Sequence, residues 1–546
     1  MSASTDSSAT DVDAGESGSP KIEALFLIRF DKKVGYVTYT IAWKRTTTDI
    51  PLENAVEFKS LPSGLHSLQS DLVYFTHEGY AGLSAFARGE ASEEERNANF
   101  VSVGVLARRD GAYGRLGRGW LLAGRLQNIA ASLADDLDAV TPLEEFWEEQ
   151  TSGAKSHGEA SSNGAEVKGH SRARAISTVS AVTKDDERLP EYHPALALLQ
   201  YIDVFGPLIF RLQQAALLRK RILFVGHPPV RAMCEFVYIL SILSSLSARD
   251  AELLIPGSES LTRLPTLFSV GVHDIPSLEG PRHGGHTPGN ENAEGWAACT
   301  TDEIIATKTK LYDIIVELPQ THDAPAQQRR WPRIRTSDGS LIKASQRDVA
   351  RYRLLHKELF KHRNASQPAP EAYADDEEEE GAPLISRDEV DAKRADDDYN
   401  EAYDDTVVEP MTWTRLAYLG FMWWASAGEK DAYIMAERDN DRELIGDLAE
   451  YSQLVETAII AYFHRQSSLL IQTLSQLIEG DREENGEAEE GEALVIDRTE
   501  LSRLGLDTWS EADRAFVQEF GTLYFGRRVE VRGNEVDCCG LRVPVF

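Results

Sequence analysis

Cysteine is scarce in this sequence, which has only Cys234, Cys299, Cys538 and Cys539 among 546 residues. So few cysteines exclude a disulfide-stapled fold, and they lack the two spaced pairs of a structural zinc site. The longest apolar run, Leu416–Ala427, has about a dozen residues, whereas a membrane span needs roughly 20. The N-terminus shows no basic stretch followed by an apolar segment, so no secretory signal is expected. We expect a cytoplasmic protein, or one bound peripherally to endomembranes.

Catalytic signature motifs are absent as well: the sequence contains no G-x-x-x-x-G-K-[ST], H-E-x-x-H, C-x-x-C or G-x-S-x-G. The glycines of Gly114–Gly119 are not spaced as in a dinucleotide-binding loop. His227, beside two prolines and without a carboxylate partner in the sequence, is interpreted as a structural residue at a strand end. The histidines His273, His283 and His286 lie among Gly and Pro, which indicates a polar loop rather than a metal site. We therefore predict no catalytic residue, no cofactor and no metal, and at most a regulator of another enzyme.

Basic residues are outnumbered, with 57 Lys and Arg against 89 Asp and Glu and a net charge of −32. This charge excludes a nucleic-acid coat protein, because a duplex would repel it. The acidity is concentrated in Glu371–Asp405, with 16 acidic and 3 basic residues, and in Glu479–Glu492, with 8 and 1. Both segments lack large apolar residues at any period, so we expect disorder there. They are interpreted as solvated loops, with a regulatory docking segment as the alternative.

A basic tract precedes the larger acidic run. Arg329–Arg363 carries 11 basic and 3 acidic residues. Such a tract suits phospholipid headgroups, and it equally suits pairing with the acidic run that follows. We favour the pairing.

Composition and periodicity predict an α/β protein with three folded blocks. The first block alternates short apolar strands, beginning with a hairpin of Ile22–Phe30 and Val34–Trp43, and ends in an amphipathic helix over Leu116–Leu137. In the second block, short strands alternate with helices, which predicts a mainly parallel sheet. The third block is mostly helical. The expected boundaries are a disordered tail 1–20, a first lobe 21–150, a disordered linker 151–188, a central lobe 189–365, a disordered acidic insert 366–408, and a helical region 409–546 with an acidic loop 479–493.

Within the second block, a helix over Pro207–Arg221 is followed by the strand Ile222–Gly226 and by a helix from Val230 to about Leu246. Ser345 and Asp348 form a predicted capping box for a helix over Gln346–Lys361. Further strands are expected at Glu252–Ile255, Thr266–Val272, Trp296–Thr301, Asp313–Pro319 and in a hairpin over Arg333–Ser345.

Several segments, in this order along the chain, resemble DENN-domain proteins of the LCHN-type branch. The resemblance implies an N-terminal longin-like lobe (uDENN), a central α/β DENN lobe and a mostly helical, dDENN-like C-terminal region. The linker, the loop 280–294 and the acidic insert depart from the family pattern. The segments that carry the resemblance are VEFKSLPSGLHSLQSDLVYF (Val56–Phe75), FGPLIFRLQQAALLRKRILFVGHPPV (Phe205–Val230), GWAACTTDEIIATKTKLYDIIVELP (Gly295–Pro319), LDTWSEADRAFVQEFGTLYFGRRVEV (Leu506–Val531) and DCCGLRV (Asp537–Val543).

Such proteins are best known as guanine-nucleotide exchange factors for Rab-type small GTPases in vesicle traffic. The resemblance therefore implies a Rab-type partner, which the protein would bind and stabilise in its nucleotide-free state, with peripheral membrane contact and no nucleic acid. In Val56–Phe75, Pro62 and Gly64 are equally consistent with a simple turn. The partner-binding candidates in this segment are Lys59, Ser60, Ser63, Gly64 and His66.

Two alternatives remain open. Folliculin-like relatives stimulate GTP hydrolysis with an arginine of the longin lobe, and Arg115 and Arg118 occupy a comparable stretch. An ordinary salt-bridging or solvated role for both arginines competes with that hypothesis. The other alternative is a non-catalytic trafficking scaffold.

Overall fold

The computed structural model describes residues 20–31, 38–89, 99–109, 114–156, 189–279, 295–319, 330–365, 403–425, 432–446, 455–485, 493–532, 535–538 and 541–544. Residues 1–19 of the predicted tail, the loop 280–294, most of the linker, most of the acidic insert and residues 486–492 of the acidic loop lie outside these ranges. Three edges of the predicted segments were wrong. A helix continues to Ser156, another continues to Asn485, and Val407 and Val408 are buried in the core.

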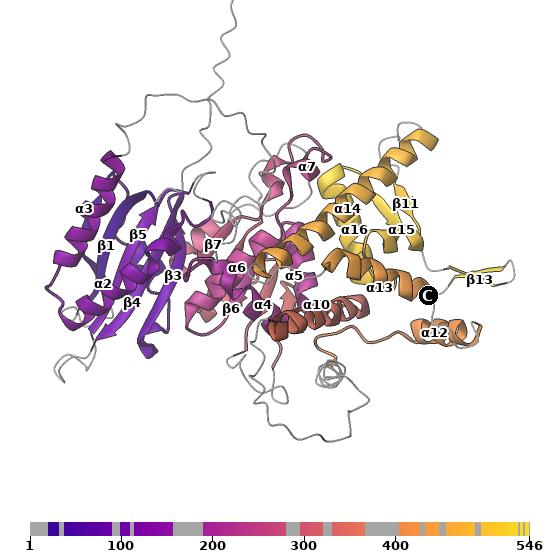
Figure 1. Ribbon diagram of the computed structural model, residues 1–546, viewed down its shortest axis with the longest axis horizontal. Coiled ribbons are helices and arrows are strands. Elements are labelled where there is room, and N and C mark those ends of the chain that lie inside the picture. Colours follow the sequence, from indigo (N-terminus) through magenta and orange to yellow (C-terminus); the bar gives the residue numbers. More distant parts are fainter. Residues whose placement is uncertain are drawn as a thin grey trace, which may run out of the picture.

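One ten-stranded sheet runs through the first lobe and the central lobe, in the order β10-β9-β6-β8-β7-β3-β4-β5-β1-β2 (Figure 1). The first lobe contributes antiparallel strands. The central lobe contributes the parallel strands β6 to β9 and an antiparallel edge strand, β10. The α/β class is therefore confirmed. The strands are β1 (Ile22–Asp31), β2 (Thr38–Thr46), β3 (Ser70–His77), β4 (Tyr80–Gly89), β5 (Asn99–Ala107), β6 (Ile222–Val225), β7 (Thr266–Ser269), β8 (Ala297–Thr300), β9 (Ile314–Glu317) and β10 (Arg333–Thr336).

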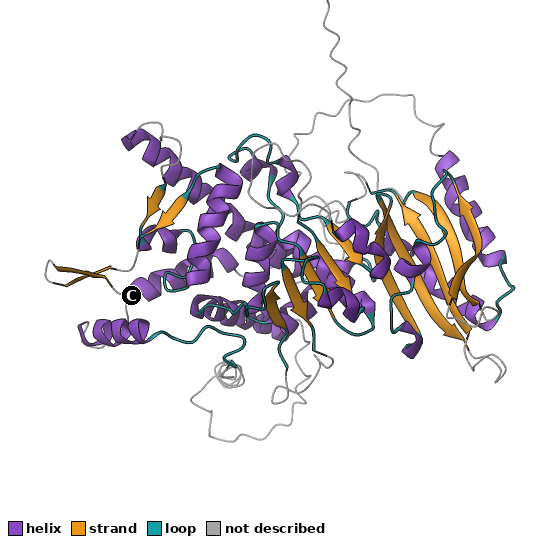
Figure 2. Ribbon diagram, turned by 180° about the vertical axis from the view of Figure 1, so that it is seen from behind, coloured by secondary structure: helices purple, strands orange, loops and turns teal. Residues whose placement is uncertain are grey.

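Helices cover both faces of this sheet (Figure 2). Along β1, Leu25 and Leu27 enter the core beneath α2, while Phe26 and Ile28 enter a smaller core on the opposite face. This alternation follows the two-residue period of a strand. The helical elements of the first lobe are α1 (Val56–Ser60), η1 (Leu65–Ser67), η3 (Gly119–Leu122), α2 (Ala123–Asp135) and α3 (Thr141–Ser156).

Helix α2 begins later than the predicted start at Leu116. Gly114 and Gly117 have positive φ, and so does Arg118 (54°), so the chain makes turns before η3 and α2 begin. Left-handed residues do not continue a right-handed helix.

The central lobe follows the predicted alternation, with one exception. Glu252–Ile255, predicted as a strand, follows a short helix that Ser247 caps by accepting the Asp250 N–H at 3.0 Å. Leu254 is apolar because it packs into the C-terminal core, not because it lies in the sheet. The predicted capping box of Ser345 and Asp348 is confirmed by reciprocal hydrogen bonds. The helical elements here are η5 (Pro194–Ala197), α4 (Leu198–Phe205), α5 (Leu208–Leu217), α6 (Val230–Leu243), α7 (Ala248–Ala251), η6 (Glu259–Thr262), η7 (Val272–Asp274), α8 (Ile275–Leu278), α9 (Glu303–Thr307) and α10 (Gln346–Ala365).

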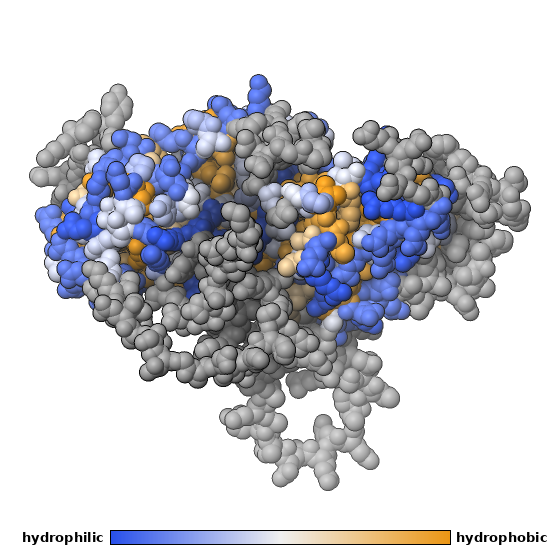
Figure 3. Space-filling model, turned by 90° about the horizontal axis from the view of Figure 1, so that it is seen from above, coloured by the Kyte–Doolittle hydropathy of each residue, from blue (hydrophilic) through white to orange (hydrophobic). Residues whose placement is uncertain are grey.

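The C-terminal region is mostly helical, as predicted, and packs against α5, α6 and α10. The molecular surface seen from above is largely hydrophilic, and apolar residues gather in a region right of the centre (Figure 3). Two small two-stranded sheets complete the C-terminal region. The elements are α12 (Trp413–Ala425), α13 (Ala432–Ile445), α14 (Val455–Asn485), β11 (Leu494–Ile496), α15 (Arg498–Arg503), α16 (Glu511–Phe525), β12 (Val529–Val531), β13 (Glu535–Cys538) and β14 (Leu541–Pro544).

No single helix in the described ranges has both the length and the hydropathy to cross a bilayer. The pair Pro194–Phe205 and Leu208–Leu217 meets that test only when taken together, across a bend of 118°.

Candidate functional site: the seam between the two lobes

The two lobes meet where β3 pairs with β7. The pairing joins a single residue pair, Phe75 and Phe268. Phe268 is fully buried and has a positive φ of 58°, beside a register shift in the pairing of β7 with β8. A bulky side chain in this left-handed region costs roughly 1–2 kcal/mol. The fold therefore places backbone strain at the joint that makes the sheet continuous. We call this joint and the contacts beside it the seam.

The seam lies at the carboxyl ends of the central parallel strands. Gly226–Pro229 follow β6, Val270–His273 follow β7, and Thr301 and Asp302 follow β8. In open α/β sheets, ligands bind outside this edge of the sheet. The first lobe approaches the same edge through α1 and η1, so residues of both lobes line it.

Two polar side chains of the first lobe cross the seam. Lys59 Nζ lies 2.9 Å from Asp274 Oδ1 and donates to the Thr76 carbonyl at 2.8 Å. Ser63 Oγ donates to the Asp302 carboxylate. Because Asp274 and Asp302 belong to the central lobe, these contacts fix one lobe against the other.

Ring and backbone contacts continue the same seam. The Phe58 ring stacks on the His273 imidazole with centroids 3.6 Å apart. Gly64 has a φ of +91°, and a Cβ built there would lie 2.9 Å from Pro228 Cγ. The close approach and the left-handed backbone both require glycine at this position.

Asp71 adds to the seam a contact between the first lobe and helix α6 of the central lobe. Its carboxylate lies at the start of β3 and accepts the N–H groups of Val230 at 2.6 Å and Arg231 at 3.3 Å. A first-lobe residue therefore caps a central-lobe helix, whose N-terminal dipole favours an anion. Burial raises the pKa of Asp71 to about 6, although the backbone N–H donors act in the opposite direction.

Arg115 ties the lobes together at a second place on α6. Its guanidinium donates to Ser241 Oγ and Ser245 Oγ, both at 2.7 Å. Burial lowers the pKa of Arg115 to about 10. In this structure the guanidinium is hydrogen-bonded to Ser241 of α6 and to Ser245 just after it, so use of Arg115 as an arginine finger requires these bonds to break. The arginine-finger hypothesis for Arg115 and Arg118 stays a prediction.

The partner-binding candidates therefore have different surroundings. Ser63 is exposed, Lys59 is largely covered, and Ser60 is fully buried with no hydrogen-bond partner for its Oγ among the described atoms. Ser60 is covered because α1 packs between the first-lobe sheet and the central lobe. The side chain of His66 lies outside the described residues. The structure brings Lys59, Ser63 and Gly64 together at the seam.

Sequence reasoning missed the residues that receive these contacts. Asp302 lies two residues after β8 and Asp274 lies five residues after β7, at positions where side chains of parallel strands converge. Their place after predicted strands was the available signal. Asp71 offered none, because a cap supplied by another lobe is invisible in sequence spacing.

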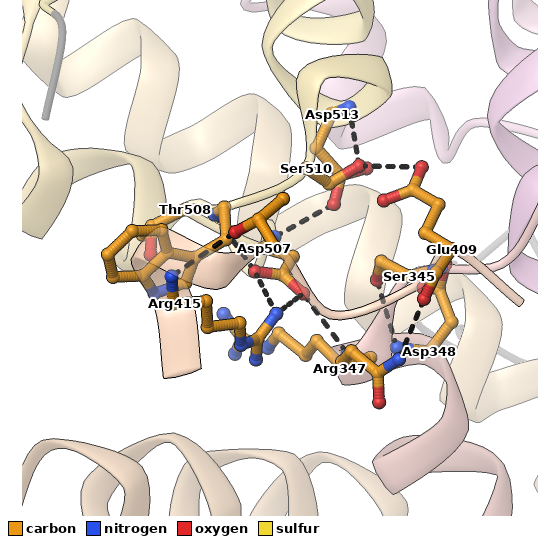
Figure 4. Close-up of polar contacts among 12 residues, drawn as sticks. Ser345, Arg347, Asp348, Glu409, Arg415, Asp507, Thr508, Ser510 and Asp513 are labelled. Atoms are coloured by element: carbon orange, nitrogen blue, oxygen red, sulfur yellow. Dashed lines mark hydrogen bonds and ion pairs between the residues drawn. The ribbon is translucent and has the colours of Figure 1, made fainter. Parts of the chain in front are cut away.

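A second polar cluster joins the central lobe to the C-terminal region (Figure 4). Arg211 of α5 lies 3.0 Å from Asp348 of α10 and 2.6 Å from Asp513 of α16. Glu409, on the segment that leads to α12, lies 3.6 Å from the same guanidinium. Burial raises the pKa of Glu409 to about 7, since Arg211 only partly offsets it.

Further arginines extend this cluster. Arg347 and Arg351 of α10 both bind Asp441 of α13, at 3.2 and 3.1 Å. Arg415 of α12 binds Asp507 at 3.0 Å (Figure 4). Burial opposes ionisation of Asp507, but Arg415 and nearby backbone donors outweigh it and lower its pKa. The cluster fastens the C-terminal helices, and its arginines are engaged with carboxylates.

Comparison with known proteins identifies the family. Residues 25–328 match the family described as DENN domain-containing protein 11, and residues 408–544 match the family described as Domain of unknown function (DUF4484). The first match covers more than half of the chain. This chain belongs to the DENN domain-containing protein 11 family. The seam lies within that match, because Lys59, Asp71 and Asp302 all fall inside it.

The relatives differ in how much of the chain they share. DENN domain-containing protein 11 of Xenopus laevis is 35% identical over 302 residues, which are 54% of this chain and 59% of the relative. The protein of the same name from Danio rerio is 33% identical over 299 residues, or 54% of each chain. This DENN-family chain thus spans little more than half the length of these relatives. The Saccharomyces cerevisiae protein described as Uncharacterized protein ANR2 is 25% identical over 562 residues, covering 95% of this chain and 94% of the relative.

Proposed function

We propose that this protein is a guanine-nucleotide exchange factor for a Rab-type small GTPase in vesicle and endomembrane traffic. Family membership supports the proposal, because DENN-domain proteins generally act on Rab GTPases. Exchange requires tighter binding of the nucleotide-free GTPase than of the loaded one. It needs no catalytic acid, base or metal from the exchange factor.

The seam is the observation that carries this proposal. Two lobes that share one sheet present a continuous surface, with first-lobe residues lying across the carboxyl ends of the central strands. Ile304 on α9 lies at this edge, two residues after Asp302, and is 59% exposed. A large apolar side chain exposed beside a polar rim suits the anchor of a protein interface. We therefore place the GTPase across the seam, in contact with Ile304.

The test is release of a fluorescent GDP analogue from a panel of Rab GTPases by the full chain. We expect at least one Rab to release nucleotide more than tenfold faster. Ile304→Asp should reduce that acceleration by about 30-fold or more, because loss of an interface hot spot costs at least about 2 kcal/mol. Val495→Asp is the matched control, since Val495 is 49% exposed on β11, away from the seam. Equal loss in both variants, or no release from any Rab, would contradict the proposal.

The same experiments separate the alternatives. A scaffold would capture a Rab without accelerating release. An activator would accelerate phosphate release from the GTP-loaded Rab. In that assay, Arg115→Ala and Arg118→Ala test the arginine-finger hypothesis, and unchanged hydrolysis in both variants would exclude it.

A further inference from the structure

The solvent face of α10 is cationic. Between Gln346 and Lys361, the exposed positions are Ala350, Arg353, Lys357 and Lys361. The three cations follow one another at intervals of four residues, so they lie on one side of the helix. We call Arg353, Lys357 and Lys361 the cationic stripe.

Positive charges along one side of a helix repel one another and destabilise the helix unless anionic groups lie beside them. Like charges four residues apart destabilise a helix by roughly 0.2–0.5 kcal/mol per pair. Lys361 pairs with Glu358 at 2.7 Å, but Arg353 and Lys357 form no ion pair with any residue that the structure describes. A helix face on which two of three cations have no ion pair among the described residues, in a chain with a net charge of −32, favours an anionic occupant.

The acidic run Glu371–Asp405 is tied to both ends of α10. It begins six residues after the helix ends at Ala365. On its return, Tyr403 packs on Trp331 with ring centroids 5.5 Å apart.

Just beyond the run, the chain is fixed beside the first turn of α10. The Ala344 N–H donates to the Val407 carbonyl at 2.8 Å, and the Glu409 N–H donates to the Ala344 carbonyl at 2.8 Å. Ala344 lies two residues before α10 begins. The chain therefore leaves at one end of α10 and returns at the other, a distance of about 30 Å for a helix of this length. Figure 1 shows α10 at the lower edge of the molecule, near the segment that leads to α12.

We propose that the acidic run Glu371–Asp405 binds the cationic stripe and covers α10 within the same molecule. The charges are complementary, with a net −13 in the run against three cations in the stripe. A tethered segment reaches its site at an effective concentration in the millimolar range, which favours it over a free competitor. The contact between exposed charges weakens as salt shortens the Debye length below about 10 Å. The stripe is thereby withheld from other polyanions, anionic bilayers included.

Zero-length carbodiimide cross-linking of the full chain tests the contact, because it joins a lysine amine only to a carboxylate that touches it. We expect cross-linked peptides that join Lys357 or Lys361 to the acidic run. Lys308 and Lys310 are the matched controls, since both are exposed but lie after α9. Links from the stripe should be at least tenfold more abundant than links from the controls, and should disappear in 1 M salt. Mixing isotopically labelled and unlabelled protein shows whether both peptides come from one molecule.

Vesicles provide the second readout. Wild-type protein should bind phosphatidylserine vesicles at least tenfold more weakly than the variant E377Q, E378Q, E379Q, E380Q, in which the run is partly neutralised. Adding Arg353→Gln, Lys357→Gln and Lys361→Gln to that variant should abolish the gain. Equal linking of stripe and control lysines, links only between different molecules, or equal vesicle binding by wild type and the E377Q–E380Q variant would each overturn the proposal.

Discussion

Replacing Arg211 with methionine should detach the C-terminal region from the central lobe. Methionine fills a similar volume but leaves the carboxylates of Asp348 and Asp513 without their shared cation. Both carboxylates are about 2% exposed, as is the Arg211 side chain. These two carboxylates raise the pKa of Arg211 against the effect of burial, so the ion pairs stabilise the charged guanidinium.

The expected cost follows from that burial. Removing one partner of a buried ion pair typically costs about 3–5 kcal/mol, since it leaves uncompensated charge behind. Each 1.4 kcal/mol is a factor of ten in an equilibrium, so the opening equilibrium of α16 should rise by roughly 100- to several-thousand-fold. Arg528→Met is the matched control. Arg528 pairs with Glu530 at 2.8 Å, but its side chain is 68% exposed, and a surface pair contributes under about 1 kcal/mol.

Hydrogen exchange measured by mass spectrometry reads out the opening. Amides of α16 should exchange faster in Arg211→Met, while amides of β4 and β5 in the first lobe stay protected. The triple variant R211M, D348N, D513N removes the uncompensated charges and should recover most of the protection. Exchange of α16 no faster than in Arg528→Met would refute the assignment of this cluster as the fastening of the C-terminal region.

Three further predictions concern the seam and Glu409. Asp71→Ala removes a cap of α6 and should destabilise the protein by about 1–2 kcal/mol in thermal or denaturant unfolding, with faster amide exchange in the first turn of α6. Gly64→Ala should lower stability more than Gly79→Ala. Both glycines have positive φ, but only Gly64 would place its Cβ against Pro228, so equal losses would contradict the close packing of the seam. The pKa of Glu409 is raised by burial from 4.5 to about 7, so its stabilising contribution is greatest at low pH and is lost as pH rises through 7. Wild-type stability should therefore fall between pH 5 and pH 8, and Glu409→Gln should reduce that fall. The expected reduction is on the order of 2 kcal/mol, because the side chain is 30% exposed and solvent weakens the effect. An unchanged pH profile would contradict this.

Local patterns were enough to predict most elements of the fold. The apolar run Ile222–Val225, followed by two prolines and an apolar helix, predicts β6 and α6 because strand and helix periods differ. The same logic misassigned Glu252–Ile255, since a short apolar run does not reveal whether it packs in a sheet or against a helix bundle. Joining the two lobes into one sheet was beyond sequence reasoning. The single pairing of Phe75 with Phe268 connects residues almost 200 positions apart and leaves no periodic trace.

Only the first-lobe side of the candidate site could be predicted from the sequence. The segment around Lys59 and Gly64 was found through resemblance, but its partners Asp274 and Asp302 come from other strands that tertiary folding brings close. The polar cluster around Arg211 was missed for the same reason. Its carboxylates lie more than 130 positions away along the chain, and a buried arginine looks like any basic residue in an amphipathic helix.

Only one backbone pair connects the two halves of the sheet, so the side-chain contacts of the seam determine how far the joint can rotate. Strands within the first lobe are bonded along most of their length, so β3 and β2 move as one plate. With β2 four strands beyond β3, at roughly 4.8 Å per strand, a rotation of about 5° at Phe268 would displace β2 by roughly 2 Å. If a partner protein bound to both halves of the sheet, that rotation would shear its contact surface.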